Sequence, residues 1–212
     1  MLLAIDTATS LTGVALYDGS VLAEAVWHSG RDHTAQLLPQ LTLLLAHLGR
    51  DRHDIAAVAV ALGPGSWSGL RVGLSSAKGL ALAHEIPLIG IGTLDALHYQ
   101  YRGELPTVAI IRLGRDRFAR IADDGSIANV AASELSVGIS SATLFCGDLD
   151  AELCNFIREQ LGALAHFPAP ATAIRRPGFL AEMAWERYQR GAVDDAASLE
   201  PIYLGQAVRI QI

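Results

Sequence analysis

A glycine-rich block dominates the first half of this 212-residue chain. The block reads GPGSWSGLRVG over residues 63–73, and an almost wholly apolar run at 55–62 precedes it. A pattern of small residues at helical spacing follows it, as far as residue 84. Glycines let the backbone turn tightly, and free N–H groups at a helix start can face an anion. The block therefore predicts a strand, a tight loop and a helix of an α/β fold.

Motifs for phosphate binding and nucleophilic catalysis do not match the glycine block. A P-loop needs Gly-Lys followed by Ser or Thr, and Lys78-Gly79 has the reverse order. The dinucleotide fingerprint needs a spacing one residue shorter than that from Gly65 to Gly69. Trp67 occupies the position where a nucleophile elbow needs serine. Two interpretations stay open: a packed strand-to-helix connection, or a loop that contacts a phosphate or a partner. The residues of the second interpretation are Gly63, Gly65, Ser66, Gly69 and Arg71.

Hydrophobic periodicity divides the chain into two similar halves. In the first half, the predicted strands are 1–6, 11–17, 21–28, 55–62 and 87–91, and the predicted helices are 32–48, 68–84 and 93–101. In the second half, the predicted strands are 107–113, 117–122, 127–130, 143–146 and 163–167, and the predicted helices are 131–137, 150–161 and 179–190. Asp32 and Thr93 are the expected caps of their helices. The repeated order predicts two packed α/β lobes, 1–103 and 104–212, with residues 199–212 as a docked tail.

The helices predicted at 32–48 and 68–84 carry unusual surfaces. Leucines of the first helix form two apolar faces, more than one neighbour can cover. Small residues recur every fourth position in the second helix, which lets another helix approach closely. These residues either pack in the core of the chain or form an interface with another subunit. The candidate interface residues are Leu37, Leu41, Leu44, Leu45, Leu48, Gly69, Gly73 and Ala77.

Composition and spacing argue against several classes of function. The chain is 51% hydrophobic with a formal net charge of −6, and no run of basic residues favours direct binding of a nucleic-acid backbone. The seven histidines do not form HExxH or another pair on one helical face, so no metal site is expected. Ser75 and Lys78 match S-x-x-K without the other elements of that signature. The two cysteines are too far apart for a CxxC motif. No signal peptide or long apolar segment is present, so we expect a cytoplasmic protein that does not associate with a membrane.

Three segments resemble the TsaB (YeaZ) family, whose members are accessory proteins in the synthesis of threonylcarbamoyladenosine at position 37 of bacterial tRNA. They are LAIDTAT at 3–9, the glycine block with AKGLA at 77–81, and IPLIG at 86–90. The resemblance is strong over about residues 1–100 and looser over 104–212, where it includes Pro201-x-Tyr203-Leu204. It implies the α/β, two-lobed fold of the actin-like ATPase (ASKHA) superfamily, with two repeated mixed-sheet lobes of ribonuclease H-like topology.

The resemblance also implies a subunit that is not itself an enzyme. The catalytic relative TsaD carries two metal-binding histidines four residues apart, and this chain has Thr93 and Leu97 at those positions. Arg112 replaces an acidic residue that the family usually has, which argues further against ATP hydrolysis. The implied partners are TsaD, TsaE and, for the chain alone, a second copy; tRNA is contacted only through the complex. No intrinsic cofactor is expected, and ATP or ADP is a candidate ligand at a subunit interface. The alternative is a metal-dependent peptidase or an ATPase of the same superfamily.

Overall fold

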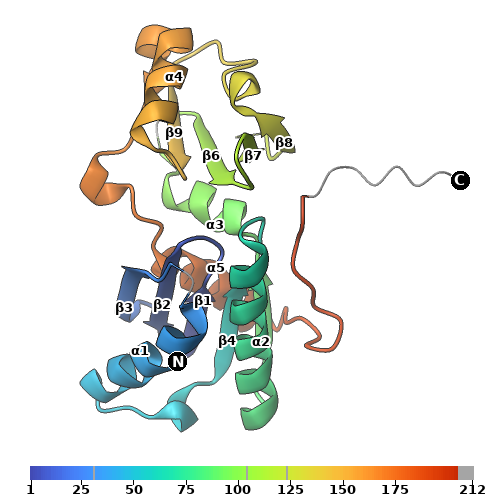
Figure 1. Cartoon of the computed structure of the whole chain (residues 1–212). Coiled ribbons are helices and arrows are strands. Elements are labelled where there is room, and N and C mark those ends of the chain that lie inside the picture. The colour runs from blue at the N-terminus through green and yellow to red at the C-terminus, as the bar shows by residue number, and fades with distance from the viewer. Residues whose placement is uncertain (31, 104, 123, 205–212) are drawn as a thin grey trace, which may run out of the picture.

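The computed structural model describes residues 1–30, 32–103, 105–122 and 124–204. It has two α/β lobes, one above the other in Figure 1, and each is built on a five-stranded mixed sheet. The first sheet contains β1 (Leu2–Asp6), β2 (Leu11–Tyr17), β3 (Val21–His28), β4 (Ala57–Ala61) and β5 (Leu88–Ile91). The second sheet contains β6 (Thr107–Arg112), β7 (Arg117–Ile121), β8 (Ile127–Ala131), β9 (Thr143–Gly147) and β10 (Ala165–His166). The helices are α1 (His33–His47), α2 (Trp67–His84), α3 (Thr93–Gln100), α4 (Ala151–Leu161) and α5 (Pro177–Gln189).

The two sheets have the same topology. The first has the order β3-β2-β1-β4-β5, and the second has the equivalent order β8-β7-β6-β9-β10. In each sheet the first three strands of the lobe are antiparallel, and the last two are parallel to the first. The predicted fold class, an α/β chain with two repeated mixed-sheet lobes, is therefore confirmed.

Helices cover both faces of each sheet. In the first lobe, α1 and α2 pack on one face and α5 packs on the other. In the second lobe, α3 and α4 cover the two faces. The strands β1 and β4 are buried along their whole length, which explains why both are apolar runs without alternation.

The helices next to the lobe boundary pack on the opposite lobe's sheet. The helix α3 precedes residue 103, yet its Leu94 and Leu97 lie in the core of the second sheet. The helix α5 belongs to the second half of the chain, yet its Leu180 and Ala184 lie in the core of the first sheet. The helices α3 and α5 also contact each other. The two lobes are therefore interlocked.

Several local predictions differ from the structure. Thr93 does not cap α3, because its hydroxyl accepts a hydrogen bond from the N–H of Gly63 (3.0 Å). Asp32 precedes α1 without a capping bond from its side chain. The helix predicted at 131–137 is only a 3₁₀ turn, Ala132–Glu134, and the strand predicted at 163–167 shortens to β10.

The C-terminal tail docks on the first lobe as far as it is described. The N–H of Ile202 donates to the carbonyl oxygen of Leu62 (2.8 Å). Residues 205–212 of the predicted tail lie outside the described residues. None of the helices in the described part of the chain has the length and apolar composition that a membrane span needs.

Candidate functional site

The glycine block connects β4 to α2 and packs against the turn after β1. A Cβ atom added to Gly65 would lie 2.2 Å from the carbonyl oxygen of Ala8, and one added to Gly69 would lie 2.1 Å from that of Thr7. At Gly73 it would lie 2.3 Å from the hydroxyl oxygen of Thr7, which donates to the carbonyl oxygen of Gly69 (2.7 Å). The small face of α2 is therefore in contact with the chain's own β1–β2 turn.

Several N–H groups of the glycine block already have acceptors within the chain. Gly63 donates to Thr93 Oγ1 (3.0 Å), and Ser66 donates to the carbonyl oxygen of Ala8 (2.6 Å). Gly69 donates to the hydroxyl oxygen of Ser66 (3.3 Å), which caps α2. These bonds favour the interpretation of the block as a packed strand-to-helix connection. They also leave fewer backbone N–H groups that could bind a phosphate.

The predicted interface residues lie mainly in the core of the first lobe, which is the other of the two interpretations that the sequence left open. Four leucines of α1 are 1–9% exposed because α1 lies flat on the sheet and directs them into its core. Leu48 is half-buried against the same cluster. Gly69, Gly73 and Ala77 are buried on the inner face of α2. The four buried leucines are Leu37, Leu41, Leu44 and Leu45.

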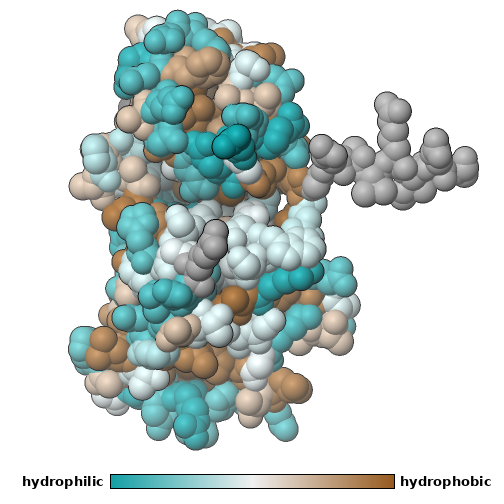
Figure 2. All heavy atoms as spheres, in the orientation of Figure 1, coloured by the Kyte–Doolittle hydropathy of each residue, from teal (hydrophilic) through white to brown (hydrophobic). Residues whose placement is uncertain are grey.

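Other apolar residues of α1 and α2 reach the surface. Leu38 and Leu43 on α1 are 49% and 50% exposed, and Leu82 on α2 is 80% exposed. Figure 2 shows hydrophobic side chains among polar ones on the face of the lower lobe that carries these helices. These three leucines give α1 and α2 an apolar outer surface.

A cleft of about 1290 Å³ separates the lobes. It is lined by residues 8–11 after β1, by 112–115 after β6, by 147–150 after β9 and by the start of α2. The loops at the carboxyl ends of equivalent parallel strands in the two lobes therefore face each other across the cleft. In α/β folds such edges are the usual place for a ligand.

The C-terminal segment 202–204 crosses the side of this cleft and contacts both lobes. On the first lobe, the ring of Tyr203 lies 4.6 Å from that of Trp67 between centroids, and its hydroxyl oxygen accepts from Arg71 Nε (3.2 Å). The Arg71 guanidinium lies over the Trp67 ring at 3.7 Å from its centroid. On the second lobe, Asn129 Nδ2 donates to the carbonyl oxygen of Leu204 (2.7 Å). Arg71, predicted for a phosphate loop, is thus part of an aromatic cluster.

A buried ion pair lies next to the cleft, in contact with Thr9 and Leu11 of its lining. Asp6, the last residue of β1, accepts hydrogen bonds on both carboxylate oxygens from Arg175, which precedes α5. The same guanidinium donates to Thr9 Oγ1 (3.2 Å) and to the carbonyl oxygen of Leu11 (3.4 Å). Both charged side chains are only 6% exposed. Burial alone would lower the pKa of Arg175, but the Asp6 carboxylate beside it raises this pKa.

Asp148 lies on the second lobe's side of the cleft. It follows β9, lines the cleft and accepts a hydrogen bond from the N–H of Arg112 (3.0 Å). Burial raises the pKa of Asp148, although the positive charge of Arg175 opposes the shift and the charge of Asp6 adds to it. The cleft therefore has a carboxyl group of the second lobe in its lining and the buried Asp6–Arg175 pair next to it.

Thr93 and Leu97 have structural positions in α3. Both are fully buried, Thr93 against the glycine block and Leu97 in the core of the second lobe. Among residues 1–30, 32–103, 105–122 and 124–204, no group of three His, Cys, Asp or Glu side chains is arranged to hold a metal ion. Arg112, at the family's usual acidic position, pairs with Asp150 (2.6 Å) at the rim of the cleft.

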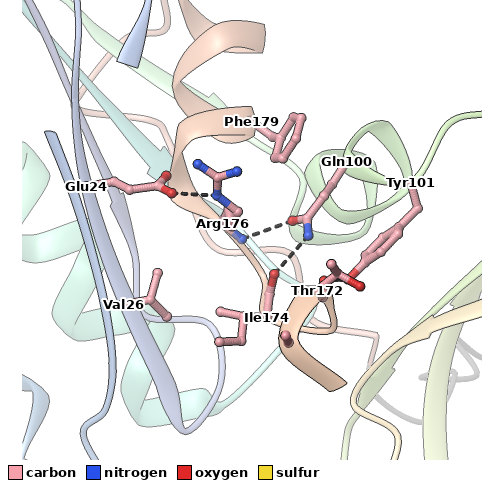
Figure 3. A pocket seen from close by; sticks show the side chains of 9 residues that line it. Glu24, Val26, Gln100, Tyr101, Thr172, Ile174, Arg176 and Phe179 are labelled. Carbon is pink, nitrogen blue, oxygen red and sulfur yellow. Dashed lines mark hydrogen bonds and ion pairs between the residues drawn. The ribbon is translucent and has the colours of Figure 1, made fainter. Parts of the chain in front are cut away.

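A smaller cavity of about 470 Å³ lies between β3, α3 and the segment before α5 (Figure 3). At its wall Arg176 pairs with Glu24 of β3. Gln100 accepts from the N–H of Arg176 (2.9 Å) and donates to the carbonyl oxygen of Ile174 (2.8 Å), as Figure 3 shows. These polar groups hold the segment in place, which fixes the adjacent Arg175.

Sequence reasoning missed the Asp6–Arg175 ion pair and the cleft residue Asp148. Asp6 and Arg175 are separated by 169 positions, so no local spacing connects them. The repeat does not connect Asp6 with Asp148 either, because Asp6 ends β1 whereas Asp148 follows β9, which is the equivalent of β4. Nothing in the sequence indicated that Arg175 pairs with Asp6.

Comparisons with known proteins agree with the repeated α/β lobes. A family model described as "TsaD: tRNA N6-adenosine threonylcarbamoyltransferase" matches residues 21–138, more than half of the chain. YeaZ from Pseudomonas aeruginosa has a solved structure that superposes with a TM-score of 0.76 at 24% identity, over 96% of this chain and 99% of that one. At this identity the superposition establishes the fold.

Sequence relatives establish the family. The Escherichia coli tRNA threonylcarbamoyladenosine biosynthesis protein TsaB is 42% identical over 93 residues, which cover 44% of this chain and 40% of that protein. The match thus spans about two fifths of that relative's length. A Mycobacterium tuberculosis protein, Rv3421c, is 31% identical over 212 residues, covering 95% of this chain and 90% of its own. The chain belongs to the TsaB (YeaZ) family, within the wider family that the TsaD model describes.

Proposed function

We propose that this chain is a non-catalytic subunit required for forming N6-threonylcarbamoyladenosine at position 37 of tRNA. It binds and stabilises the catalytic subunit TsaD, TsaE joins the assembly, and tRNA is contacted only through the complex. The work takes place in the cytoplasm. The names of the curated relatives support the pathway, and the chain's own geometry supports the non-catalytic role.

One observation carries the proposal. At the positions where the resemblance places the two metal-binding histidines of TsaD, this chain has the fully buried side chains of Thr93 and Leu97. A hydroxyl group and an aliphatic chain do not replace imidazole ligands. Both side chains are committed to packing, so this part of α3 contributes to stability.

The proposed contact with TsaD is the outer face of α1 and α2. Leu38, Leu43 and Leu82 are each about half exposed or more, and apolar groups of this size are stabilised when a partner covers them. In the absence of TsaD, a second copy of the chain covers the same leucines, which gives a homodimer. ATP or ADP, where it takes part, binds at an interface between subunits.

Co-purification with tagged TsaD tests the proposal. The variant carries Leu38→Glu and Leu82→Glu, which place charges on the outer face without entering the core. Val137→Glu is the matched control, since Val137 is 65% exposed on the second lobe. Wild type and control should be retained by TsaD, and the double variant should be lost while its circular dichroism spectrum is unchanged. Retention of the double variant at wild-type yield would contradict the proposed surface.

The tRNA modification itself gives a second readout. In cells depleted of their own TsaB, wild type and Val137→Glu should restore threonylcarbamoyladenosine, measured by mass spectrometry of digested tRNA. The double variant should not restore it. If the wild-type chain binds TsaD but does not restore threonylcarbamoyladenosine, the proposed role in tRNA modification is wrong although the proposed contact with TsaD is right.

A further inference from the structure

Two segments that lie far from each other in Figure 1 connect the lobes and line the cleft between them. The first is the segment between β10 and α5, drawn in orange at the left of the lobe boundary, whose Pro170 and Ile174 line the cleft. The second is the C-terminal segment, drawn in red at the right, whose residues 202–204 line the cleft as well. The cleft is therefore bounded on two sides by chain that reaches from lobe to lobe.

The first two residues of segment 202–204 are attached to the first lobe. The N–H of Ile202 donates to the carbonyl oxygen of Leu62, just after β4 (2.8 Å). The carbonyl oxygen of Ile202 lies so close to Gly63 that a Cβ atom at that position would be 2.6 Å from it. The ring of Tyr203 packs on that of Trp67 at the start of α2. The start of the glycine block is thus the docking surface of this segment.

The last residue of segment 202–204 is attached to the second lobe. Leu204 packs against the apolar cluster between α3 and the second sheet. Its carbonyl oxygen accepts a hydrogen bond from Asn129 Nδ2 of β8 (2.7 Å). Asn129 Oδ1 in turn accepts from Arg117 Nε (2.8 Å), which orients the amide group. Two neighbouring residues, Tyr203 and Leu204, are therefore attached to different lobes.

The two connections differ in how deeply they are buried. The segment before α5 is held by Arg175, which is 7% exposed and paired with Asp6. In segment 202–204, Ile202 is 43% exposed and Tyr203 is 40% exposed. Exposed hydrogen bonds and few buried apolar contacts are typical of segments that open locally while the rest of a protein stays folded. Segment 202–204 should therefore detach more readily than the segment before α5.

We propose that residues 202–204 form a releasable clasp between the lobes. While the clasp is docked, it closes one side of the cleft and fixes the spacing of the loops that face each other across it. When the clasp detaches, the loops at 8–11 and 112–115 move apart, and the segment before α5 remains as the connection about which the lobes turn. The clasp thus controls the width of the cleft. This inference concerns the chain alone and does not rest on the proposed role in tRNA modification.

Hydrogen exchange of the purified full-length chain, followed by mass spectrometry, tests whether the two attachments depend on each other. The variant Asn129→Asp removes the donor to Leu204 and keeps the oxygen that accepts from Arg117. Peptides that contain the Ile202 amide, which is bonded to the first lobe, should exchange about 2- to 10-fold faster, as expected for the loss of one hydrogen bond. Asn155→Asp is the matched control, because Asn155 is an exposed asparagine on α4 of the same lobe and also accepts from an arginine side chain (2.9 Å).

Pulsed electron paramagnetic resonance measures the width of the cleft itself. Nitroxide labels are attached through Ser10→Cys and Arg115→Cys, two exposed positions that line the cleft from different lobes. The background carries Cys154→Ser, because Cys154 is partly exposed, whereas Cys146 is fully buried and is left in place. The distance between the two labels reports how far apart the lobes are at the cleft.

The labelled chain is compared with and without Asn129→Asp and Tyr203→Ala, which together loosen both ends of the clasp. In this variant the mean distance between the labels should lengthen and its distribution should broaden, whereas Asn155→Asp should change neither. If the double variant does not fold, Asn129→Asp alone carries the same expectation. An unchanged distance would show that segment 202–204 is a docked tail without influence on the cleft. Exchange at Ile202 that is unaffected by Asn129→Asp would also overturn the proposal.

Discussion

Gly69 and Gly79 lie on the same helix, α2, in opposite surroundings. A Cβ atom at Gly69 would lie 2.1 Å from the carbonyl oxygen of Thr7, whereas one at Gly79 would meet no atom within 4 Å. We predict that Gly69→Ala lowers the free energy of unfolding by about 1–3 kcal/mol through overpacking. Gly79→Ala should raise it by about 0.5–1 kcal/mol, since alanine favours a helix more than glycine does. Urea denaturation of both variants measures the difference. Equal effects would show that α2 does not lie against the β1–β2 turn.

His33 should make stability depend on pH. Its Nδ1 lies 2.7 Å from Thr12 Oγ1 and 2.8 Å from Ser29 Oγ, and burial lowers its pKa although Asp32 opposes the shift. The unfolded chain therefore takes up this proton at a higher pH than the folded chain. The contribution of neutral His33 is fully present above the unfolded pKa of about 6.5 and is lost as the pH falls toward the lowered folded pKa.

The measurement is Tm at pH values of about 7.5 and 5.5, which bracket the unfolded pKa of histidine. The Tm of wild type should fall more between these values than that of His33→Asn, whose side chain does not titrate. An equal fall in both proteins would assign the pH dependence to other groups.

At the scale of the elements, α1 separates leucines of the core from leucines of the surface. Leu41 is 5% exposed and Leu43 is 50% exposed. Leu41→Ala should lose about 2–5 kcal/mol of unfolding free energy because it leaves a cavity against the first sheet. Leu43→Ala should change it by no more than about 0.5 kcal/mol, as expected for surface positions. Chemical denaturation compares them, and similar losses would contradict the orientation of α1.

Periodicity was a good guide to the elements and a poor guide to their partners. The strands β2 and β3 have the predicted bounds, and α2 begins within one residue of the prediction. The leucines of α1 showed that it has an apolar face. The sequence alone does not tell whether a sheet of the same lobe or another subunit packs on that face. The same limit applies to the candidate site. The glycine block was located, whereas the contacts that occupy its N–H groups come from Ala8 and Thr93.

At the scale of the whole molecule, the repeat was predictable and the exchange of helices was not. Two halves with the same order of strands and helices predict two similar lobes. Which sheet a helix covers depends on the path of the chain between lobes, and that path leaves no periodic signal. The helices α3 and α5 thus cover the sheet of the opposite half, and Arg175 arrives at Asp6 through the same crossing.

The exchange predicts that neither half folds alone. A fragment of residues 1–103 lacks α5, so the sheet face that packs on Leu180 and Ala184 is open to water. A fragment of 104–212 lacks Leu94 and Leu97 of α3. Each should show no cooperative thermal transition in calorimetry, because exposed apolar surface of this kind removes the main driving force for folding. The control is an equimolar mixture of the two fragments, in which each supplies the helix that the other lacks. The mixture should regain the near-ultraviolet circular dichroism of the intact chain. A cooperative transition in isolated 1–103 would show that α5 is dispensable for the first lobe.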